Sequence, residues 1–227
     1  MTIYKPKYSV PNLLDLVAEG EGLRIEFKRL IHSAPKIARS ITAFANTSGG
    51  VILIGVDDDR RIVGIQSEKE ALQVIDEAMR FHIEPKPRIE VHFEEFKRRM
   101  VLLVDIPESP ERPHFHIEPF IRSDSGKHGV ERRVFIRDGS HNRAASEDRI
   151  ELMLSSREPV RVSFTDRERR LLDWLNRHDD RITAEEFADS AGIPMKEARR
   201  ILVSLVRSGA LRLDTANGGN SYTLAHR

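Results

Sequence analysis

The strongest structural signals of the sequence lie in residues 22–65, GLRIEFKRLIHSAPKIARSITAFANTSGGVILIGVDDDRRIVGI. Its opening, LRIEFKRL, alternates apolar and charged side chains, which is the period-two pattern of a half-buried strand. A helical pattern over residues 36–46 follows, and Gly49 and Gly50 separate it from the run VILIGV. Because that run is apolar throughout, it predicts a central strand covered on both faces. We expect the two glycines to serve architecture, since a tight junction between helix and strand needs them.

The flanking sequence predicts an α+β domain around a mixed or antiparallel sheet. Residues 61–65, RIVGI, follow an aspartate-rich turn and are expected to form a hairpin with the apolar strand. Capping signals and apolar periodicity predict helices over 67–81 and 146–154, and strands over 88–93, 101–106 and 132–140. The proline-rich stretch ESPERPHFHIEP predicts a loop, in which His114 and His116 are expected to be solvated.

From residue 160 onward the pattern changes. Thr165 and Thr183 each open a capping box and a short helix, and the sequence SAGIP predicts a tight turn before a third helix. Two strand-like segments around residues 217–220, NGGN, then predict a β-hairpin. Three helices followed by a hairpin are the pattern of a winged helix-turn-helix. We therefore expect two domains, residues 1–159 and 160–227.

Composition limits the classes of function. Of the 227 residues, 32% are charged and 39% are apolar, and the net charge is only +1. A nucleic-acid footprint must therefore be a local patch rather than bulk charge. The chain has no cysteine, which excludes disulfides and thiolate zinc sites. No signal-peptide pattern and no apolar run of about 18 residues is present, so we expect a soluble, cytoplasmic protein that does not contact a membrane.

The third helix of the tail carries a basic face opposite an apolar one. At 100° per residue, four basic side chains fall within an arc of about 100°: Lys196, Arg199, Arg200 and Arg207. A helix with these two faces, preceded by a tight turn, suits docking in the major groove, where Lys and Arg neutralise phosphates. The alternative is a solvated outer face, because Glu197 lies in the same turn.

Three acids and a lysine form the second candidate site. Glu26 and Lys28 are two apart on a strand and so point to the same face. A carboxylate-bound metal beside a lysine is an arrangement that cleaves phosphodiesters, because both offset developing phosphate charge. Glu21 and Asp57 add two carboxylates, and three such groups suit Mg²⁺ or Mn²⁺. The alternative is that Asp57 belongs to an ordinary charged turn and Glu21 to a helix end.

These motifs resemble a known family. The segments EGLRIEFK, ITAFANTSGGVILIGVDD, IVGI and VFIRDGSHNRAAS resemble the AlbA-like nucleic-acid-binding domain of the Schlafen family, over roughly residues 14–154. Bacterial relatives of this domain are often fused to helix-turn-helix segments. In Schlafen members that cleave RNA, two glutamates and an aspartate form the active site, and the resemblance carries these roles to Glu21, Glu26 and Asp57. The sequence departs from many relatives at Gly22, where they have serine.

The sequence favours a DNA-binding transcriptional regulator that acts as a homodimer or a higher homo-oligomer, since twofold symmetry is common among such proteins. RNA is an alternative ligand, and binding needs no cofactor. A metal-dependent nuclease or endoribonuclease that uses Glu21, Glu26, Asp57 and Lys28 with Mg²⁺ or Mn²⁺ is the second hypothesis. A protein-interaction scaffold is the third. ATP is not expected, because NTSGG lacks the Gly-Lys-Ser/Thr ending of a phosphate-binding loop.

Overall fold

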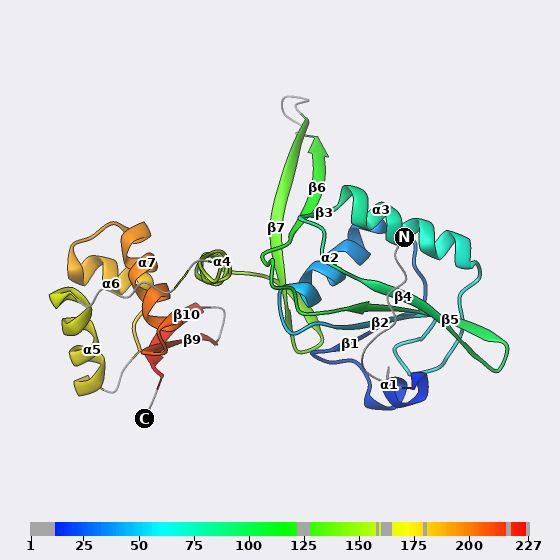
Figure 1. Cartoon of the computed structure of the whole chain (residues 1–227), viewed down its shortest axis with the longest axis horizontal. Coiled ribbons are helices and arrows are strands. Elements are labelled where there is room, and N and C mark those ends of the chain that lie inside the picture. The colour runs from blue at the N-terminus through cyan, green and yellow to red at the C-terminus, as the bar shows by residue number, and fades with distance from the viewer. Residues whose placement is uncertain are drawn as a thin grey trace. The chain divides into compact units, whose positions relative to one another are not determined.

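The computed structural model describes residues 12–121, 128–157, 159, 165–178, 181–216 and 219–225. The chain divides into two compact units, Met1–Ala145 and Ser146–Arg227 (Figure 1). We expected the division near residue 159. It falls earlier because helix α4 (Glu147–Ser155) packs against helix α7 (Met195–Arg207) of the second unit.

The first unit is built on a mixed sheet whose central strand is the apolar run of the opening stretch. In the order β1-β2-β5-β4, this sheet contains β1 (Ile25–Lys28), β2 (Gly50–Ile54), β5 (Arg99–Ile106) and β4 (Glu90–Phe96). β1 and β2 are parallel, and the other pairs are antiparallel. Ile52 and Ile54 of β2 enter one hydrophobic core, whereas Val51 and Leu53 enter the other. The prediction of a central strand covered on both faces is therefore confirmed.

Helices cover both faces of this sheet (Figure 1). α2 (Ala34–Ala45) and α3 (Glu68–Phe81) contribute Ile41, Phe44 and Ile75 to the core on one face. α1 (Leu13–Glu19) contributes Leu13 and Leu16 to the core on the other face. Each of these apolar side chains contributes roughly 1.5–3 kcal/mol when it is fully buried.

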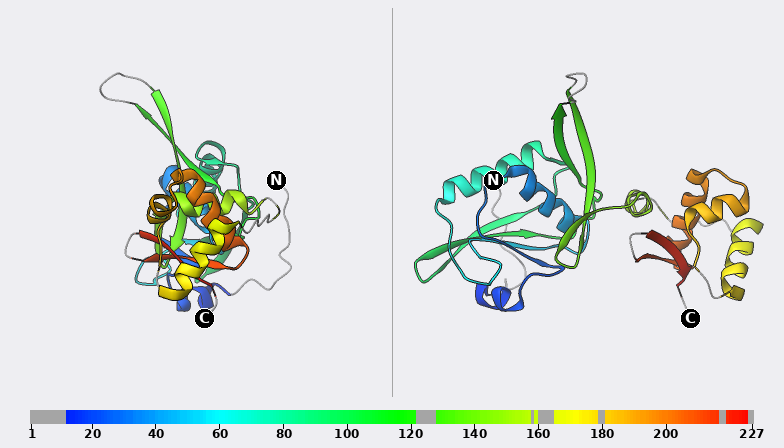
Figure 2. Two further views of the ribbon diagram at one scale, coloured as in Figure 1. Left: turned by 90° about the vertical axis from the view of Figure 1, so that its left-hand side faces the viewer. Right: turned by 180° about the vertical axis from the view of Figure 1, so that it is seen from behind.

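A second sheet packs on α2. In the order β3-β6-β7-β8, it contains β3 (Ile83–Glu84), β6 (Phe115–Ile121), β7 (His128–Asp138) and β8 (His141–Ala144), and neighbouring strands are antiparallel. α2 contacts β6, β7 and β8 as well as β2 and β5 of the first sheet. α2 is therefore the element that joins the two sheets, and β6 and β7 project from the unit as a long hairpin (Figures 1 and 2).

Two sequence predictions for this unit are wrong. Residues 61–65 form no strand, although the chain returns antiparallel there through a bridge between Val56 and Ile62 and a hydrogen bond from the Val63 N–H to the Gly55 carbonyl at 2.8 Å. The predicted proline-rich loop contains most of β6, and His114 and His116 are buried, at 0% and 1% exposure. Their burial is compensated because His116 Nε2 lies 2.9 Å from the Pro35 carbonyl oxygen and His114 Nδ1 lies 2.6 Å from that of Pro85.

The architectural role predicted for Gly49 and Gly50 is confirmed. Gly49 has a φ of +69°, and a Cβ there would lie 2.7 Å from the backbone nitrogen of Glu108. A Cβ at Gly50 would lie 2.6 Å from the ring of Phe44. The chain therefore passes from α2 into β2 only because neither residue has a side chain.

The second unit contains short helices and a hairpin. After α4 come α5 (Asp166–His178), α6 (Ala184–Ala191), α7, β9 (Leu211–Ala216) and β10 (Gly219–Leu224). Thr183 forms the predicted capping box with Glu186, and Gly192 ends α6 in the left-handed conformation with a φ of 62°. β9 and β10 pair antiparallel, as expected. Residues 217 and 218 of the predicted hairpin tip lie outside the described residues.

The second unit has its own core. Its buried side chains come from α5, α6, α7 and both strands, and include Leu175, Phe187, Leu202, Leu205 and Tyr222. Ile182 forms a backbone bridge with Tyr222, which ties the start of α6 to the hairpin. In the part of the chain that the structure describes, no helix combines the length and the apolar character that crossing a membrane requires.

We predict that His116 makes the stability of the first unit depend on pH. Burial lowers the pKa of His116, although its bond to the Pro35 carbonyl opposes this shift. The unfolded chain therefore takes up a proton near pH 6.5, its usual pKa, while the folded chain stays neutral there, so stability falls as pH drops through about 6.5. Urea unfolding at pH 7.5 and 5.5 measures how much the free energy of unfolding falls between these two pH values. This fall should be smaller in His116→Gln. An equal loss in both proteins would contradict this assignment.

Candidate functional site

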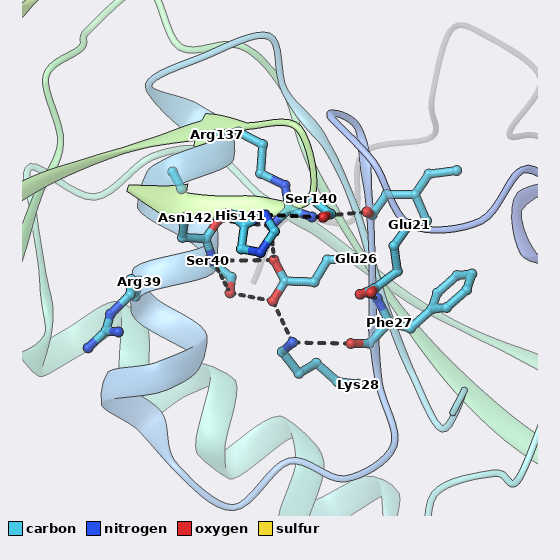
Figure 3. Close-up of polar contacts among 12 residues, drawn as sticks. Glu21, Glu26, Phe27, Lys28, Arg39, Ser40, Arg137, Ser140, His141 and Asn142 are labelled. Atoms are coloured by element: carbon cyan, nitrogen blue, oxygen red, sulfur yellow. Dashed lines mark hydrogen bonds and ion pairs between the residues drawn. The ribbon is translucent and has the colours of Figure 1, made fainter. Parts of the chain in front are cut away.

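Glu26 on β1 is the centre of a buried polar network (Figure 3). The residue is 3% exposed, and both carboxylate oxygens accept hydrogen bonds. Oε1 accepts from Ser40 Oγ at 2.7 Å and is paired with Lys28 Nζ at 2.7 Å. Oε2 accepts from Arg137 Nη1 at 2.6 Å and from Asn142 Nδ2 at 3.3 Å. A buried carboxylate is tolerated only when it is compensated in this way.

Arg137 on β7 is the main partner of Glu26. Its side chain is 1% exposed, and its guanidinium carbon lies 4.7 Å from the centre of the Phe44 ring. Nε donates to the Gly22 carbonyl at 3.0 Å, and Nη2 donates to that of Ile25 at 3.1 Å. Arg137 therefore ties β7 to β1 and to the segment before β1. We call Glu26, Lys28, Ser40, Arg137 and Asn142 the Glu26 network.

The other two acids of the predicted site have separate partners. Glu21 Oε1 accepts the backbone N–H of Phe27 at 2.8 Å. Asp57 Oδ2 is paired with Arg29 Nη1 at 2.9 Å and with Arg61 Nη2 at 3.3 Å. Both acids thus have local structural roles, one on the β1 backbone and one in the turn after β2.

Glu21, Glu26 and Asp57 each have partners of their own in this structure. Within the described residues, no three His, Cys, Asp or Glu side chains gather into a group that suits a metal ion. The physical reason is the neutralisation of Glu26 by Arg137 and Lys28, which a divalent cation would have to displace. Mg²⁺ and Mn²⁺ need several available oxygen ligands, so this donor set does not fit them.

Sequence reasoning missed two buried polar residues that hold α2 to the second sheet. Asn46, 2% exposed, donates from Nδ2 to the carbonyl oxygens of His114 at 2.9 Å and Phe135 at 3.0 Å. Its Oδ1 accepts the His114 N–H at 2.7 Å. Ser40 lies on α2, and its Oγ accepts a hydrogen bond from Asn142 Nδ2 of β8 at 3.0 Å and donates one to Glu26. A polar side chain on the apolar face of a helical pattern was the available signal in both cases.

Several nitrogen-bearing side chains and the exposed acid Glu21 lie around the Glu26 network. Figure 3 shows Lys28, Arg39 and His141 arranged around the network, and all three reach the surface, with the Lys28 side chain 38% exposed. The Arg39 guanidinium carbon lies 5.0 Å from the centre of the Phe135 ring, which orients the side chain. This surface, which we call the basic rim, offers the charge of Arg39 and hydrogen-bond donors of Lys28 and His141 to an anion.

In the second unit, the residues of the predicted basic face of α7 differ in their surroundings, because some are ion-paired and others are exposed. Arg199 donates from Nε to Asp148 Oδ1 at 2.6 Å, and its Nη2 is paired with Glu147 Oε2 at 2.7 Å. Its side chain is only 22% exposed because α4, which carries both acids, packs on α7. Lys196 and Arg200 are exposed, whereas Arg207 is half-buried. The structure thus leaves Lys196 and Arg200 as the accessible part of that face.

Comparison with known proteins identifies the family. The model of the Schlafen AlbA_2 family matches residues 21–146, and the chain belongs to this family. No curated protein matches the chain.

Two solved structures resemble parts of the chain. The N-terminal domain of a RecG-related protein from Nitrosomonas europaea is 25% identical, with a TM-score of 0.40, and the match covers 55% of this chain and 89% of that one. The DIP2311 protein from Corynebacterium diphtheriae is 17% identical, with a TM-score of 0.45, over 94% of this chain. The chain spans 38% of the DIP2311 chain.

We predict that Arg137→Met destabilises the first unit by about 3–5 kcal/mol, because Glu26 would remain buried without its main counter-ion. Arg143→Met is the matched control, since the Arg143–Asp138 pair is exposed and such pairs contribute less than about 1 kcal/mol.

Urea unfolding, monitored by far-UV circular dichroism, measures the free energy of unfolding of both variants. The single tryptophan, Trp174, lies in the second unit, so its fluorescence reports that unit separately. Equal losses in the Arg137 and Arg143 variants would contradict a central role for the buried pair.

Proposed function

We propose that the protein binds nucleic acid and acts as a DNA-binding transcriptional regulator. Membership of the Schlafen AlbA_2 family suggests nucleic-acid binding. The observation that carries the proposal is the exposed pair Lys196 and Arg200 on α7. These residues are one helical turn apart, so they present two positive charges on one side of the helix.

We propose that α5–α7 and the β9–β10 hairpin form a winged helix with α7 as the DNA-contacting helix. The left-handed residue Gly192 between α6 and α7, and the antiparallel hairpin after α7, support this interpretation. Glu197 lies beside the basic pair and would repel phosphate. Its Oε1 is paired with Arg167 Nη1 at 2.8 Å, which offsets that repulsion.

Arg199 has a different role in this proposal. Its ion pairs with Asp148 and Glu147 favour a structural role, in which it fixes α4 on α7. The DNA-contacting set is then Lys196 and Arg200, with Arg207 near the end of the helix as a further candidate. Contacts from such residues to phosphates position a helix in the groove, and arginine also reads guanine.

The first unit would supply a second contact through the basic rim. Lys28, Arg39 and His141 suit phosphate oxygens of DNA or RNA. We do not propose cleavage, because Glu26 is held by Arg137 and no three acids among the described residues form a group that suits a metal ion. We therefore propose binding without Mg²⁺ or Mn²⁺. A cytoplasmic homodimer remains our expectation for the working form.

We predict that Lys196→Gln/Arg200→Gln weakens binding to duplex DNA. Two lost phosphate contacts should flatten the slope of log K against log salt by about 1.8. Fluorescence anisotropy with a labelled duplex at several salt concentrations measures the slope. Arg169→Gln/Arg177→Gln, which removes two exposed charges from α5, is the matched control and should change the slope less.

Two results would contradict the proposal. An unchanged slope in a folded Lys196/Arg200 variant would remove α7 as the contact. Absence of any salt-dependent binding to DNA or RNA by the wild-type chain would favour a protein-interaction scaffold instead.

A further inference from the structure

The β6–β7 hairpin is an arm that projects from the first unit (Figures 1 and 2). At its base, β3 pairs with β6 at His116 and Phe115, and β8 pairs with β7 from Phe135 onward. Farther out, over residues 117–121 and 129–133, the described strands pair only with each other. We call these two segments the arm. A two-stranded ribbon of this kind is marginally stable alone in water, so a further strand would stabilise it.

The two edges of the arm differ in their ability to pair. In an antiparallel ladder, backbone groups of alternate residues point to the same side. The Ile117 N–H donates outward to the His82 carbonyl at 2.9 Å, so Pro119, two residues on, also faces outward. Proline has no N–H to donate, and the outer edge of β6 is therefore blunted.

The outer edge of β7 is open instead. The Val134 carbonyl accepts the Ala145 N–H at 2.8 Å on that side. By the same alternation, the backbone groups of Arg132 and Val130 also point outward. Both residues retain an N–H and a carbonyl there, and no described strand pairs with them on that side. This edge is a template for a further strand.

The side chains of the arm are apolar near this edge. Val130 is 59% exposed and Phe120 is 41% exposed. The Phe120 ring covers Gly129, where a Cβ would lie 2.5 Å from the ring. Exposed apolar side chains beside unpaired backbone groups favour a protein strand as the occupant of the edge.

The charges of the arm also favour protein over nucleic acid. Arg132 Nη2 is paired with Glu84 Oε2 at 3.2 Å, and Arg133 Nη2 with Glu131 Oε1 at 2.6 Å. Glu118 adds a negative charge on the neighbouring strand. The described part of the arm therefore has no surplus of positive charge for phosphates.

We propose that the open edge of β7 pairs with the same edge of a second copy of this chain, antiparallel, about a twofold axis through Val130. A twofold interface uses one surface twice and closes as a dimer. An axis at Arg132 would place two arginines opposite each other, and an axis at Glu131 two glutamates, both of which are unfavourable. An axis at Val130 places two valines opposite each other and covers their exposed surface.

This inference concerns assembly and stands apart from nucleic-acid binding, so either proposal can fail without the other. Light scattering of the full chain at about 10–100 μM should give about 52 kDa, twice the 26.0 kDa of one chain. Val130→Lys should weaken the dimer about tenfold or more, because lysine on an edge opposes pairing. Val130→Thr, which keeps a β-branched side chain, is the matched control and should remain dimeric.

Disulfide trapping tests the register directly, because the chain has no cysteine of its own. Opposite residues of a hydrogen-bonded antiparallel pair have Cα atoms about 5.5 Å apart, which suits a disulfide. Val130→Cys should therefore form a covalent dimer under mild oxidation. Arg133→Cys, whose Cα atoms would be about 20 Å apart in this register, should not.

Several outcomes would overturn the proposal. They are a monomeric wild-type chain at these concentrations, a dimer that Val130→Lys leaves unchanged, or equal trapping of the two cysteine variants. A wild-type chain that is monomeric and whose arm pairs only with a strand of another protein would also overturn the proposal. Trapping of Val130→Cys remains informative if the lysine variant fails to fold.

Discussion

The buried ion pair between Glu26 and Arg137 is the interaction on which the first unit depends. The two residues are 111 positions apart in the sequence and belong to different sheets. A guanidinium that is 1% exposed is stable only with a carboxylate and several backbone acceptors around it, and the segment from Gly22 to Glu26 supplies them. This ion pair and its hydrogen bonds therefore fix the positions of β1, β7 and β8 relative to one another around α2.

The same pair limits the chemistry of the site. In the cleaving members that the sequence resembles, the acid at the Glu26 position belongs to an active site. In this chain that acid is the counter-ion of Arg137, while Glu21 and Asp57 bind separate partners. The exposed guanidinium of Arg39 remains suited to an anion.

Much of the fold was predictable because local patterns and tertiary packing agree. The apolar run of β2 needs cover on both faces and obtains it, and the turn at Gly192 needs a residue that tolerates a positive φ. β6 was missed because prolines and histidines are typical of loops. Its burial depends on carbonyl groups of distant residues such as Pro35, which no local pattern reveals.

The candidate sites were less predictable, since sequence spacing does not show which opposite charge will lie beside a residue. Arg199 was correctly placed on α7, but its partner Asp148 is 51 residues earlier in the chain. The three acids were expected to converge because the resemblance grouped them. Glu26 and Asp57 are instead paired with cations, such as Arg137 for Glu26, and Glu21 accepts a backbone N–H.

The most direct test of this account is one experiment that measures binding and cleavage together. The full-length chain is incubated with end-labelled duplex DNA and with RNA, with and without Mg²⁺ or Mn²⁺. We predict retarded but intact nucleic acid, with binding that does not require the metal. Metal-dependent cleavage that disappears in a folded Glu26→Gln variant would contradict the account, because it would make Glu26 a catalytic group rather than the counter-ion of Arg137.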